Sequence, residues 1–257
     1  MRRARTPIVE LFGFRFDALT QAEAETKVVA LAREPGVHLV FTPNVDHVVT
    51  AHRRPDFRHA YEAATLQLAD GAPVVVTAYL AGRPLPGRAT GSDLLPGVCA
   101  VAAREGLRVV VCGGTPEVNE KAIGVLRARH PGFDVIGTSP PFGFDADETA
   151  TRELIAWLGG AGADVVFLCV GAPRSELWLA AHRGELPDGA YVAAGAAVDF
   201  VAGTKRRAPR LLQRIGMEWL WRLAQEPGRL GRRYLLEDVR FLPLAAREIL
   251  SKRRGRS

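Results

Sequence analysis

The sequence predicts an α/β protein built on a wound, mostly parallel sheet with helices on both faces. Short β-rich apolar runs alternate with longer helical patterns, and this alternation is typical of parallel strands joined by crossing helices. The six runs are HLVFTPN, LQLADG, LRVVVCGG, FDVIGTS, DVVFLCVGAP and AYVAAGAAVDF. A chain of 257 residues that is 47% hydrophobic can bury one full core with a small extension. We therefore expect a Rossmann-like α/β domain over residues 1–202 and a basic, amphipathic helical appendage over residues 203–257.

Local sequence signals place individual elements around these runs. A helix is predicted from Pro116 to Arg129, with Thr115 as N-cap, proline at the first helical position and His130-Pro131-Gly132 closing it. Another helix is predicted to open near Ser92 or Asp93. The first 20 residues precede the wound sheet and predict a short hairpin or an edge strand.

The positive charge of the chain is concentrated in its last quarter. Residues 204–257 hold 15 Lys and Arg against 5 Asp and Glu, whereas residues 1–203 hold 19 against 23. The same segment contains tryptophans beside its arginines, as in MEWLWRL. Such an asymmetry indicates a nucleic acid, an anionic membrane surface or a phosphorylated substrate as partner.

The sequence predicts neither a secretion signal nor a membrane span. Charged residues interrupt the apolar residues of the first 20 positions before a signal-peptide core is reached. No apolar run approaches the roughly 18 to 20 residues that cross a bilayer, so we expect a soluble or peripheral protein. Cys99, Cys112 and Cys169 are scattered and odd in number, which predicts buried reduced thiols without a disulfide framework or a metal site.

Candidate site residues follow the apolar runs directly. In wound α/β sheets, ligands bind outside the carboxyl ends of the strands. The residues at these positions are Thr42-Pro-Asn44, Asp70-Gly71, Gly113-Gly114-Thr115, Gly171-Ala-Pro-Arg174 and Asp199.

Gly113-Gly114 has two interpretations. Two glycines before a helix allow close backbone approach, and the helix then directs free N–H groups at a phosphate. A third glycine at dinucleotide spacing is missing, so a plain strand-to-helix turn explains the pair equally well.

The side chains of Asp70 and Arg88 also have two possible roles each. Asp70 follows LQLA and precedes glycine, where a carboxylate serves either as a general base or as a cap of the following turn. Arg88 lies in the loop LPGRATGSDLL, where a guanidinium either clamps a diphosphate through paired hydrogen bonds or is solvated.

Two motifs that resemble metal sites are better explained otherwise. Asp145-Ala-Asp147 matches a D-x-D pattern, but Asp147 is placed to cap a helix that begins near Glu148. His47, His52 and His59 lack cysteine or acidic partners at ligand spacing. We expect them to be histidines of helix surfaces or the edge of the core.

Ten ordered motifs carry a resemblance to a known family. They are TPN, LADG, GRATGSD, CGGTPE, HPGFDVIG, GAPRSE, GAAVDFVAG, RAP, MEWLWRL and EPGRLGRR. From about Ile8 to Arg233 the chain resembles the WecG/TagA/CpsF glycosyltransferases, glycosyltransferase family 26. The resemblance implies an inverting, metal-independent transfer of a sugar of ManNAc, ManNAcA or glucose type from a UDP-sugar to a polyprenyl-diphosphate-linked saccharide. Such steps build teichoic acid linkage units, enterobacterial common antigen or exopolysaccharides at the cytoplasmic face of the membrane.

The resemblance also implies roles for single residues. Asp70 falls on the family's catalytic base, with Ala69 in place of the usual proline. Thr42 and Asn44 fall on the pair near the reacting sugar, and Arg88 falls on the arginine that offsets charge on the departing diphosphate, with Gly87 in place of the usual Glu.

The donor-binding residues follow in the same way. The family's P-K-Q-E appears as Pro173-Arg174-Ser175-Glu176, which keeps the cation and the Glu but shortens the Gln to Ser. Asp199 matches an aspartate suited to ribose hydroxyls. The helix N-termini after Gly113-Gly114 and Gly171 are expected to help hold the diphosphate.

The appendage is implied to reach the membrane and to complete the site. The candidates for its contacts with the diphosphate or lipid are Arg207, Arg214 and Arg222.

Two other function classes stay open on the residues alone. A nucleotide-dependent oxidoreductase shares the wound sheet but needs the three-glycine fingerprint. A non-catalytic lipid- or nucleic-acid-binding module would use only the basic tail. The family resemblance favours the transferase, with no cofactor, no nucleic acid and a peripheral location at the membrane's inner face. Apolar surface under the tail is also compatible with a homo-oligomer.

Overall fold

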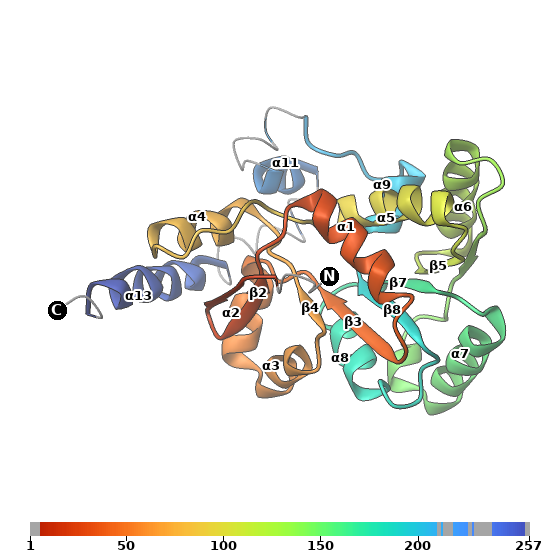
Figure 1. Ribbon diagram of the computed structural model, residues 1–257, viewed down its shortest axis with the longest axis horizontal. Coiled ribbons are helices and arrows are strands. Elements are labelled where there is room, and N and C mark those ends of the chain that lie inside the picture. The colour runs from red at the N-terminus through yellow and green to blue at the C-terminus, as the bar shows by residue number, and fades with distance from the viewer. Residues whose placement is uncertain (1–5, 210–211, 213–217, 226–227, 229–237, 255–257) are drawn as a thin grey trace, which may run out of the picture.

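The protein is a wound α/β structure around one six-stranded parallel sheet, which confirms the predicted fold class (Figure 1). The computed structural model describes residues 6–209, 212, 218–225, 228 and 238–254. The strands are β3 (Val37–Phe41), β4 (Leu66–Gln67), β5 (Val109–Gly113), β6 (Val135–Thr138), β7 (Val165–Cys169) and β8 (Gly189–Ala193). They lie in the order β4-β3-β8-β7-β5-β6, and every neighbouring pair is parallel.

Helices cover both faces of this sheet, because its central strands are apolar on both sides. All residues of β5, β7 and β8 are buried, as expected for strands without a solvent face. One face packs against α1 (Gln21–Leu31), α5 (Gly91–Glu105), α6 (Pro116–Arg129) and α9 (Ala197–Ala202). The other packs against α2 (Val45–Arg53), α3 (Pro55–Glu62), α7 (Glu148–Ala161) and α8 (Arg174–Ala181).

The capping signals of the sequence place the helices well. The helix Pro116–Arg129 has the predicted bounds, and the Thr115 hydroxyl accepts a hydrogen bond from the backbone N–H of Val118. The carboxylate of Asp147 caps α7 as expected, accepting from the N–H groups of Thr149 and Ala150.

One predicted run divides into two elements. AYVAAGAAVDF is a strand only in its first half, since β8 ends at Ala193 and α9 begins at Ala197. Gly195 turns the chain between them with a φ of +51°. Small apolar residues suit a buried strand and a buried helix alike, so composition does not separate the two. Asp199 therefore lies in the first turn of a helix and not directly after a strand.

The first residues form the expected hairpin, β1 (Ile8–Leu11) and β2 (Phe14–Asp17), which is a separate two-stranded antiparallel sheet. Residues from the far end of the chain hold it in place. Glu248 accepts a 2.8 Å hydrogen bond from the backbone N–H of Phe12 and forms a 2.6 Å ion pair with Arg83. The ring of Phe241 packs on that of Phe12, with centroids 5.1 Å apart.

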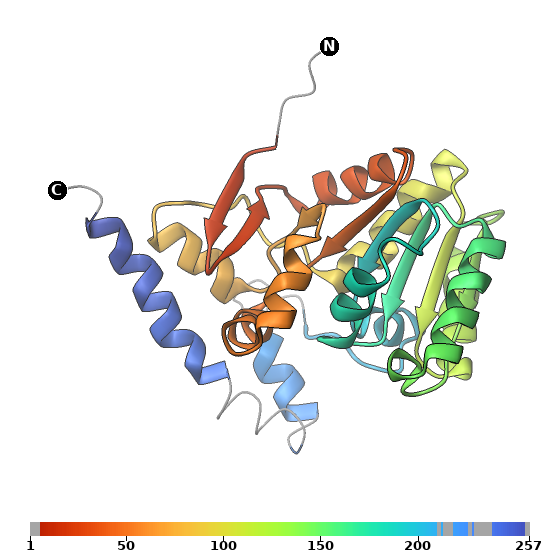
Figure 2. The same cartoon turned by 90° about the horizontal axis from the view of Figure 1, so that it is seen from below.

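The C-terminal helix α13 (Phe241–Arg254) thus packs beside the hairpin and α4 (Ala72–Leu80), as Figure 2 shows from below. The described residues also form α11 (Glu218–Gln225) and the short 3-10 helices η1 (Phe144–Ala146) and η3 (Asp238–Arg240). In the part of the chain that the structure describes, no helix combines the length and the apolar character that a membrane crossing requires.

Asn119 joins the carboxyl ends of two neighbouring strands. Its buried Nδ2 lies 2.9 Å from Val111 O, 2.8 Å from Gly113 O and 3.1 Å from Thr138 O. We expect Asn119→Ala to lower the free energy of unfolding by about 1–3 kcal/mol, because it removes a donor from buried carbonyl groups. Urea unfolding measures this. The exposed neighbour Glu120→Ala should change stability by less than about 0.5 kcal/mol, and equal loss in both variants would contradict the assignment.

Candidate active site

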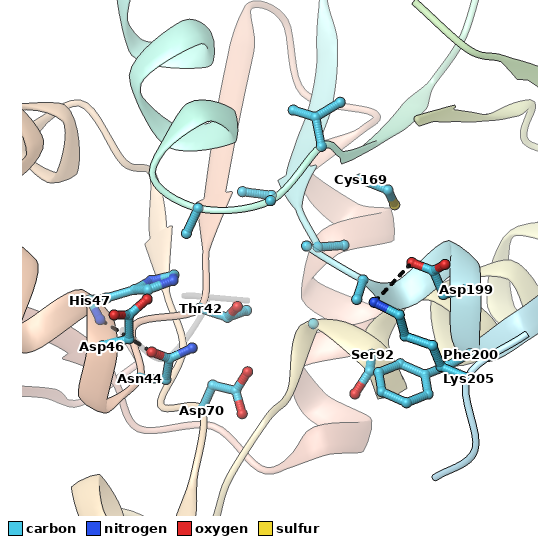
Figure 3. Close-up of a pocket in the computed structure, with 18 of the residues that line it drawn as sticks. Thr42, Asn44, Asp46, His47, Asp70, Ser92, Cys169, Asp199, Phe200 and Lys205 are labelled. Carbon is cyan, nitrogen blue, oxygen red and sulfur yellow. Dashed lines mark hydrogen bonds and ion pairs between the residues drawn. The ribbon is translucent and has the colours of Figure 1, made fainter. Parts of the chain in front are cut away.

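A cavity of about 350 Å³ opens at the carboxyl ends of β3, β4, β7 and β8. The chain connections leave this place in opposite directions. β3 is followed by β4 on one side of the sheet, whereas β5 and β6 lie on the other side, beyond β7. Wound sheets bind their ligands at such points, and the volume suits a small-molecule site. Figure 3 shows that its side chains form two groups that face each other across the cavity.

The first group contains the predicted Thr42, Asn44 and Asp70. Thr42 follows β3 and is buried, and Asn44 caps α2 by accepting a hydrogen bond from His47 N at 3.2 Å. The backbone N–H of Asp70 donates to Pro43 O at 3.0 Å, so the turns after β3 and β4 are joined. The Asp70 carboxylate points into the cavity (Figure 3). The alternative in which Asp70 caps α4 has less support, since the N-cap of that helix is Gly71.

The opposite group joins the N-terminus of α5 to α9 and the segment after it. Ser92, Asp199, Phe200 and Lys205 line this side, and Lys205 Nζ lies 4.0 Å from the Asp199 carboxylate. Gly91 allows a close approach here, since a Cβ atom would lie 3.3 Å from Thr42 Oγ1 and 3.2 Å from Ala194 Cα. The start of a 15-residue helix therefore lies at the cavity, and helix N-termini attract anions.

The appendage also lines the cavity, through Lys205, Arg206 and Gln225. Two side chains of α11, Trp221 and Gln225, each donate to Arg206 O at 3.2 Å. These contacts hold α11 beside the chain segment that leaves α9.

Of the predicted appendage arginines, the structure describes the side chain of Arg207 alone; Arg214 and the side chain of Arg222 lie outside the described residues. Arg207 forms an ion pair with Asp93 and donates to Ser92 Oγ at 3.0 Å. Burial favours a higher pKa for Asp93, but its bonds to Arg207 and Thr90 and the nearby charge of Arg88 hold that pKa below its ordinary value. Both predicted cations thus lie beside the N-terminus of α5, although neither lines the cavity.

Gly113, the last residue of β5, and Gly114 lie outside the cavity lining. A Cβ atom on Gly113 would lie 2.7 Å from Cys169 O, and one on Gly114 would lie 3.2 Å from a methyl carbon of Val198. These glycines therefore allow β5 to approach β7 and α9, which supports the plain-turn interpretation. Gly171 does line the cavity.

Arg174 does not line the cavity and forms an ion pair with Asp145. Its Nε lies 2.9 Å from an oxygen of Asp145, and its guanidinium lies 5.1 Å from the ring centroid of Phe142. Asp145 of the D-x-D sequence is thus an ion-pair partner of Arg174. Ser175 is fully buried, and its hydroxyl lies 3.3 Å from Leu168 O and from Gly171 O. Ser175 consequently supports the loop between β7 and α8.

Glu176 lines the cavity and is only 3% exposed. Burial, together with the charge of Asp46, raises the pKa of Glu176 to about 7. His47 lies on the same side, with Nδ1 2.6 Å from the hydroxyl of Tyr61. Burial also raises the pKa of Tyr61 well above its ordinary value, and the charges of Glu176, Asp70 and Asp46 act in the same direction.

Histidines and cysteines follow the sequence-based expectations in part. His52 and His59 are exposed on their helices, whereas His47 is buried and lines the cavity, which was not foreseen. The three cysteines are free and buried as expected. Cys169 borders the cavity, where burial raises its thiol pKa to about 12, so it stays protonated. Within the described ranges, no three His, Cys, Asp or Glu side chains are arranged to hold a metal ion.

Glu176→Gln is expected to change how stability depends on pH. The native state keeps the Glu176 proton up to about pH 7, whereas the unfolded chain releases it near 4.5. Wild-type stability therefore falls as the pH rises through this window, and the variant lacks that loss. The free energy of unfolding of the variant, relative to that of wild type, should increase by about 2 to 3 kcal/mol from pH 4.5 to pH 8. Urea unfolding across this range measures the gain, and a pH-independent difference would contradict the assignment.

One family of sugar-transferring enzymes matches this chain. The family model for the glycosyl transferase WecG/TagA/CpsF family matches residues 9–255, nearly the whole chain. The match spans the sheet, the cavity and the appendage alike. Membership implies an enzyme that transfers a sugar from a donor to a lipid-linked acceptor in cell-envelope polymer synthesis. This chain belongs to the WecG/TagA/CpsF family of glycosyltransferases.

Proposed function

We propose that the protein is an inverting, metal-independent hexosyltransferase. It moves a sugar of ManNAc, ManNAcA or glucose type from a UDP-sugar to a polyprenyl-diphosphate-linked saccharide. One observation carries the proposal: Thr42, Asn44 and Asp70 line one side of a cavity whose other side is formed by Lys205 and the N-terminus of α5. A carboxylate for proton removal thus faces a region that attracts a diphosphate.

In the proposed reaction Asp70 removes the proton from a hydroxyl group of the acceptor sugar. That oxygen attacks the anomeric carbon of the donor while the bond from this carbon to the UDP oxygen breaks on the opposite face. The new glycosidic bond has inverted configuration, the proton remains on Asp70, and UDP leaves. Thr42 and Asn44 lie beside the carboxylate, where their polar groups position the reacting sugar.

The negative charge of the leaving UDP is stabilised on the other side of the cavity. Lys205 and Arg206 line it, and the N-terminus of α5 adds the partial positive charge of its backbone. Arg207 and Arg88 stand behind this helix start near Asp93, and we assign them the role of raising the local positive potential. Asp199, paired with Lys205, is suited to bind ribose hydroxyls.

We also propose that the enzyme works as a peripheral protein at the cytoplasmic face of the membrane. The support is an apolar surface on two adjoining helices, α4 and α13, where Tyr79 is 72% exposed, Leu242 65% and Leu250 55%. The basic composition of the appendage suits anionic lipid headgroups next to such a surface.

The reaction is tested with UDP-sugars and a polyprenyl-diphosphate-linked GlcNAc analogue, by following UDP release in EDTA. We expect turnover with one donor, and a loss of at least about 100-fold in Asp70→Asn, which is the lower end of general-base contributions. Asp188→Asn is the matched control, because Asp188 is exposed and precedes β8 at the opposite end of the strand. Activity that survives in Asp70→Asn would exclude Asp70 as the base.

The membrane surface is tested separately by sedimentation with vesicles that contain anionic phospholipid. Leu242→Asp with Leu250→Asp should reduce the bound fraction severalfold, since two apolar contacts are replaced by charges that anionic lipid repels. Phe142→Asp is the control, because Phe142 is 98% exposed and belongs to a loop outside both helices. Equal binding of both variants would argue against this surface.

A further inference from the structure

The helix that follows the proposed base has no charged residue. α4 begins two positions after Asp70, with Gly71 as its N-cap, and its nine residues are APVVVTAYL. One side of the helix packs into the core through Val74, Thr77 and Ala78. A surface helix ordinarily carries charged or polar residues on the side that faces water. The composition of the exposed side of α4 therefore needs another explanation.

This exposed side is apolar along the whole length of the helix. Its members recur at intervals of three or four residues, which places them on one face, and they are Pro73, Val76, Tyr79 and Leu80. Val76 is 53% exposed, Tyr79 72% and Leu80 51%. We call these four residues the α4 stripe. A contiguous exposed apolar patch on a soluble protein commonly marks a contact site.

The stripe has a fixed position relative to the proposed base, because α4 is a projection that is held at both ends. The chain leaves the active site at Ala69 and returns to it at Ala89, whose N–H donates to Ala69 O at 2.8 Å. At the far end of the projection, Arg83 forms a 2.6 Å ion pair with Glu248 of α13. Figures 1 and 2 show α4 and α13 side by side at the end of the molecule away from β6.

The length of the projection suits the lipid part of the acceptor. The nine residues of α4 span about 14 Å along the helix axis, and a hexose with a diphosphate attached is of comparable length. If the hydroxyl of the acceptor sugar lies beside Asp70, the isoprene units next to the diphosphate reach Val76 and Leu80. These units are apolar and uncharged, as the stripe is, so contact between them removes apolar surface from water.

The neighbouring helix suits a different part of the membrane. On α13 the exposed Leu242 and Leu250 are separated by the exposed Arg247, and Lys252 follows them. This mixture of apolar and basic side chains fits anionic headgroups at an interface, whereas the uncharged α4 stripe fits a hydrocarbon chain.

We propose that the α4 stripe binds the first isoprene units of the polyprenyl-diphosphate acceptor and thereby holds the acceptor sugar at Asp70. This rests on the proposed function and adds to it a binding surface for the lipid of a single acceptor molecule. The contact differs from the general membrane contact of α4 and α13, because it needs no bilayer.

The test uses two water-soluble acceptors without vesicles or detergent. Both are GlcNAc diphosphates, and they carry either a dimethylallyl or a farnesyl group. UDP release is followed with the UDP-sugar that supports turnover of the polyprenyl acceptor. For wild type, KM should be about 10-fold lower for the farnesyl acceptor than for the dimethylallyl acceptor, because the longer chain buries more apolar surface on the stripe.

Val76→Gln combined with Leu80→Gln removes the centre and the end of the stripe while keeping residues that favour a helix. We expect KM for the farnesyl acceptor to rise about 10-fold, with KM for the dimethylallyl acceptor, KM for the donor and kcat unchanged. Leu242→Gln combined with Leu250→Gln on α13 is the matched control. It should leave both acceptor KM values as in wild type, since these side chains serve the bilayer.

The outcomes separate this contact from the function on which it rests. A wild type that turns over the polyprenyl acceptor but does not distinguish the two soluble acceptors would overturn the contact alone. An equal rise in KM for both acceptors in the α4 variant would overturn it too, since the stripe would then only support the turn of Asp70. A wild type that sediments as a dimer, with a monomeric α4 variant, would instead assign the stripe to a second copy of the chain. A wild type that turns over none of the three acceptors would overturn the proposed function as well.

Discussion

The parallel alignment of β3, β8 and β7 is the constraint on which the rest of the structure depends. Parallel strands bury both faces, so polar side chains on them are confined to the ends. The carboxyl ends of these three strands and of β4 meet at one edge of the sheet. Each crossing helix carries the chain from the carboxyl end of one strand back to the amino end of the next. The loops that leave the carboxyl ends therefore surround the cavity. Thr42, Asp70 and Cys169 reach the same cavity for this reason, although they are far apart in the sequence.

The charges of the cavity are separated in space, so its two sides offer different electrostatic environments to a ligand. Asp46, Asp70 and Glu176 form an acidic region, and Lys205, Arg206 and the start of α5 form a cationic one. The interaction of Arg207 with Asp93 and Ser92 fixes the cationic segment against α5. The appendage is consequently part of the wall of the site as well as a carrier of positive charge.

Much of the fold is predictable from the sequence, because buried strands require continuous apolar runs and helix caps require particular side chains. The run LRVVVCGG and the cap Thr115 illustrate both cases. Thr42, Asn44 and Asp70 could be placed together since each lies within three residues of the end of a strand. Gly113 could not be assigned, because a glycine needed for packing against β7 has the same sequence signature as one needed for a phosphate.

The remaining site residues are beyond sequence reasoning for a different reason. Lys205, Arg206 and Gln225 reach the cavity only through the way the appendage folds back, which no local pattern specifies. The burial of Glu176 depends on the helices around it, and a single Glu in an amphipathic helix is ordinarily solvated. His47 was expected at a surface or at the core edge, and its hydrogen bond to Tyr61 places it inside. In each case tertiary packing decides, and packing has no short-range signature.

The contacts of Glu248 with Phe12 and Arg83 have a consequence for the order in which the protein is made. Phe12 and Glu248 are separated by 236 positions in the chain, so the N-terminal hairpin leaves the ribosome long before its partner helix is synthesised. Domains generally begin to fold during synthesis, and the wound sheet is complete once β8 has emerged. The hairpin can acquire its contacts with Glu248 and Phe241 only after α13 has been synthesised. Docking of α13 against the hairpin therefore follows the synthesis of every strand of the sheet.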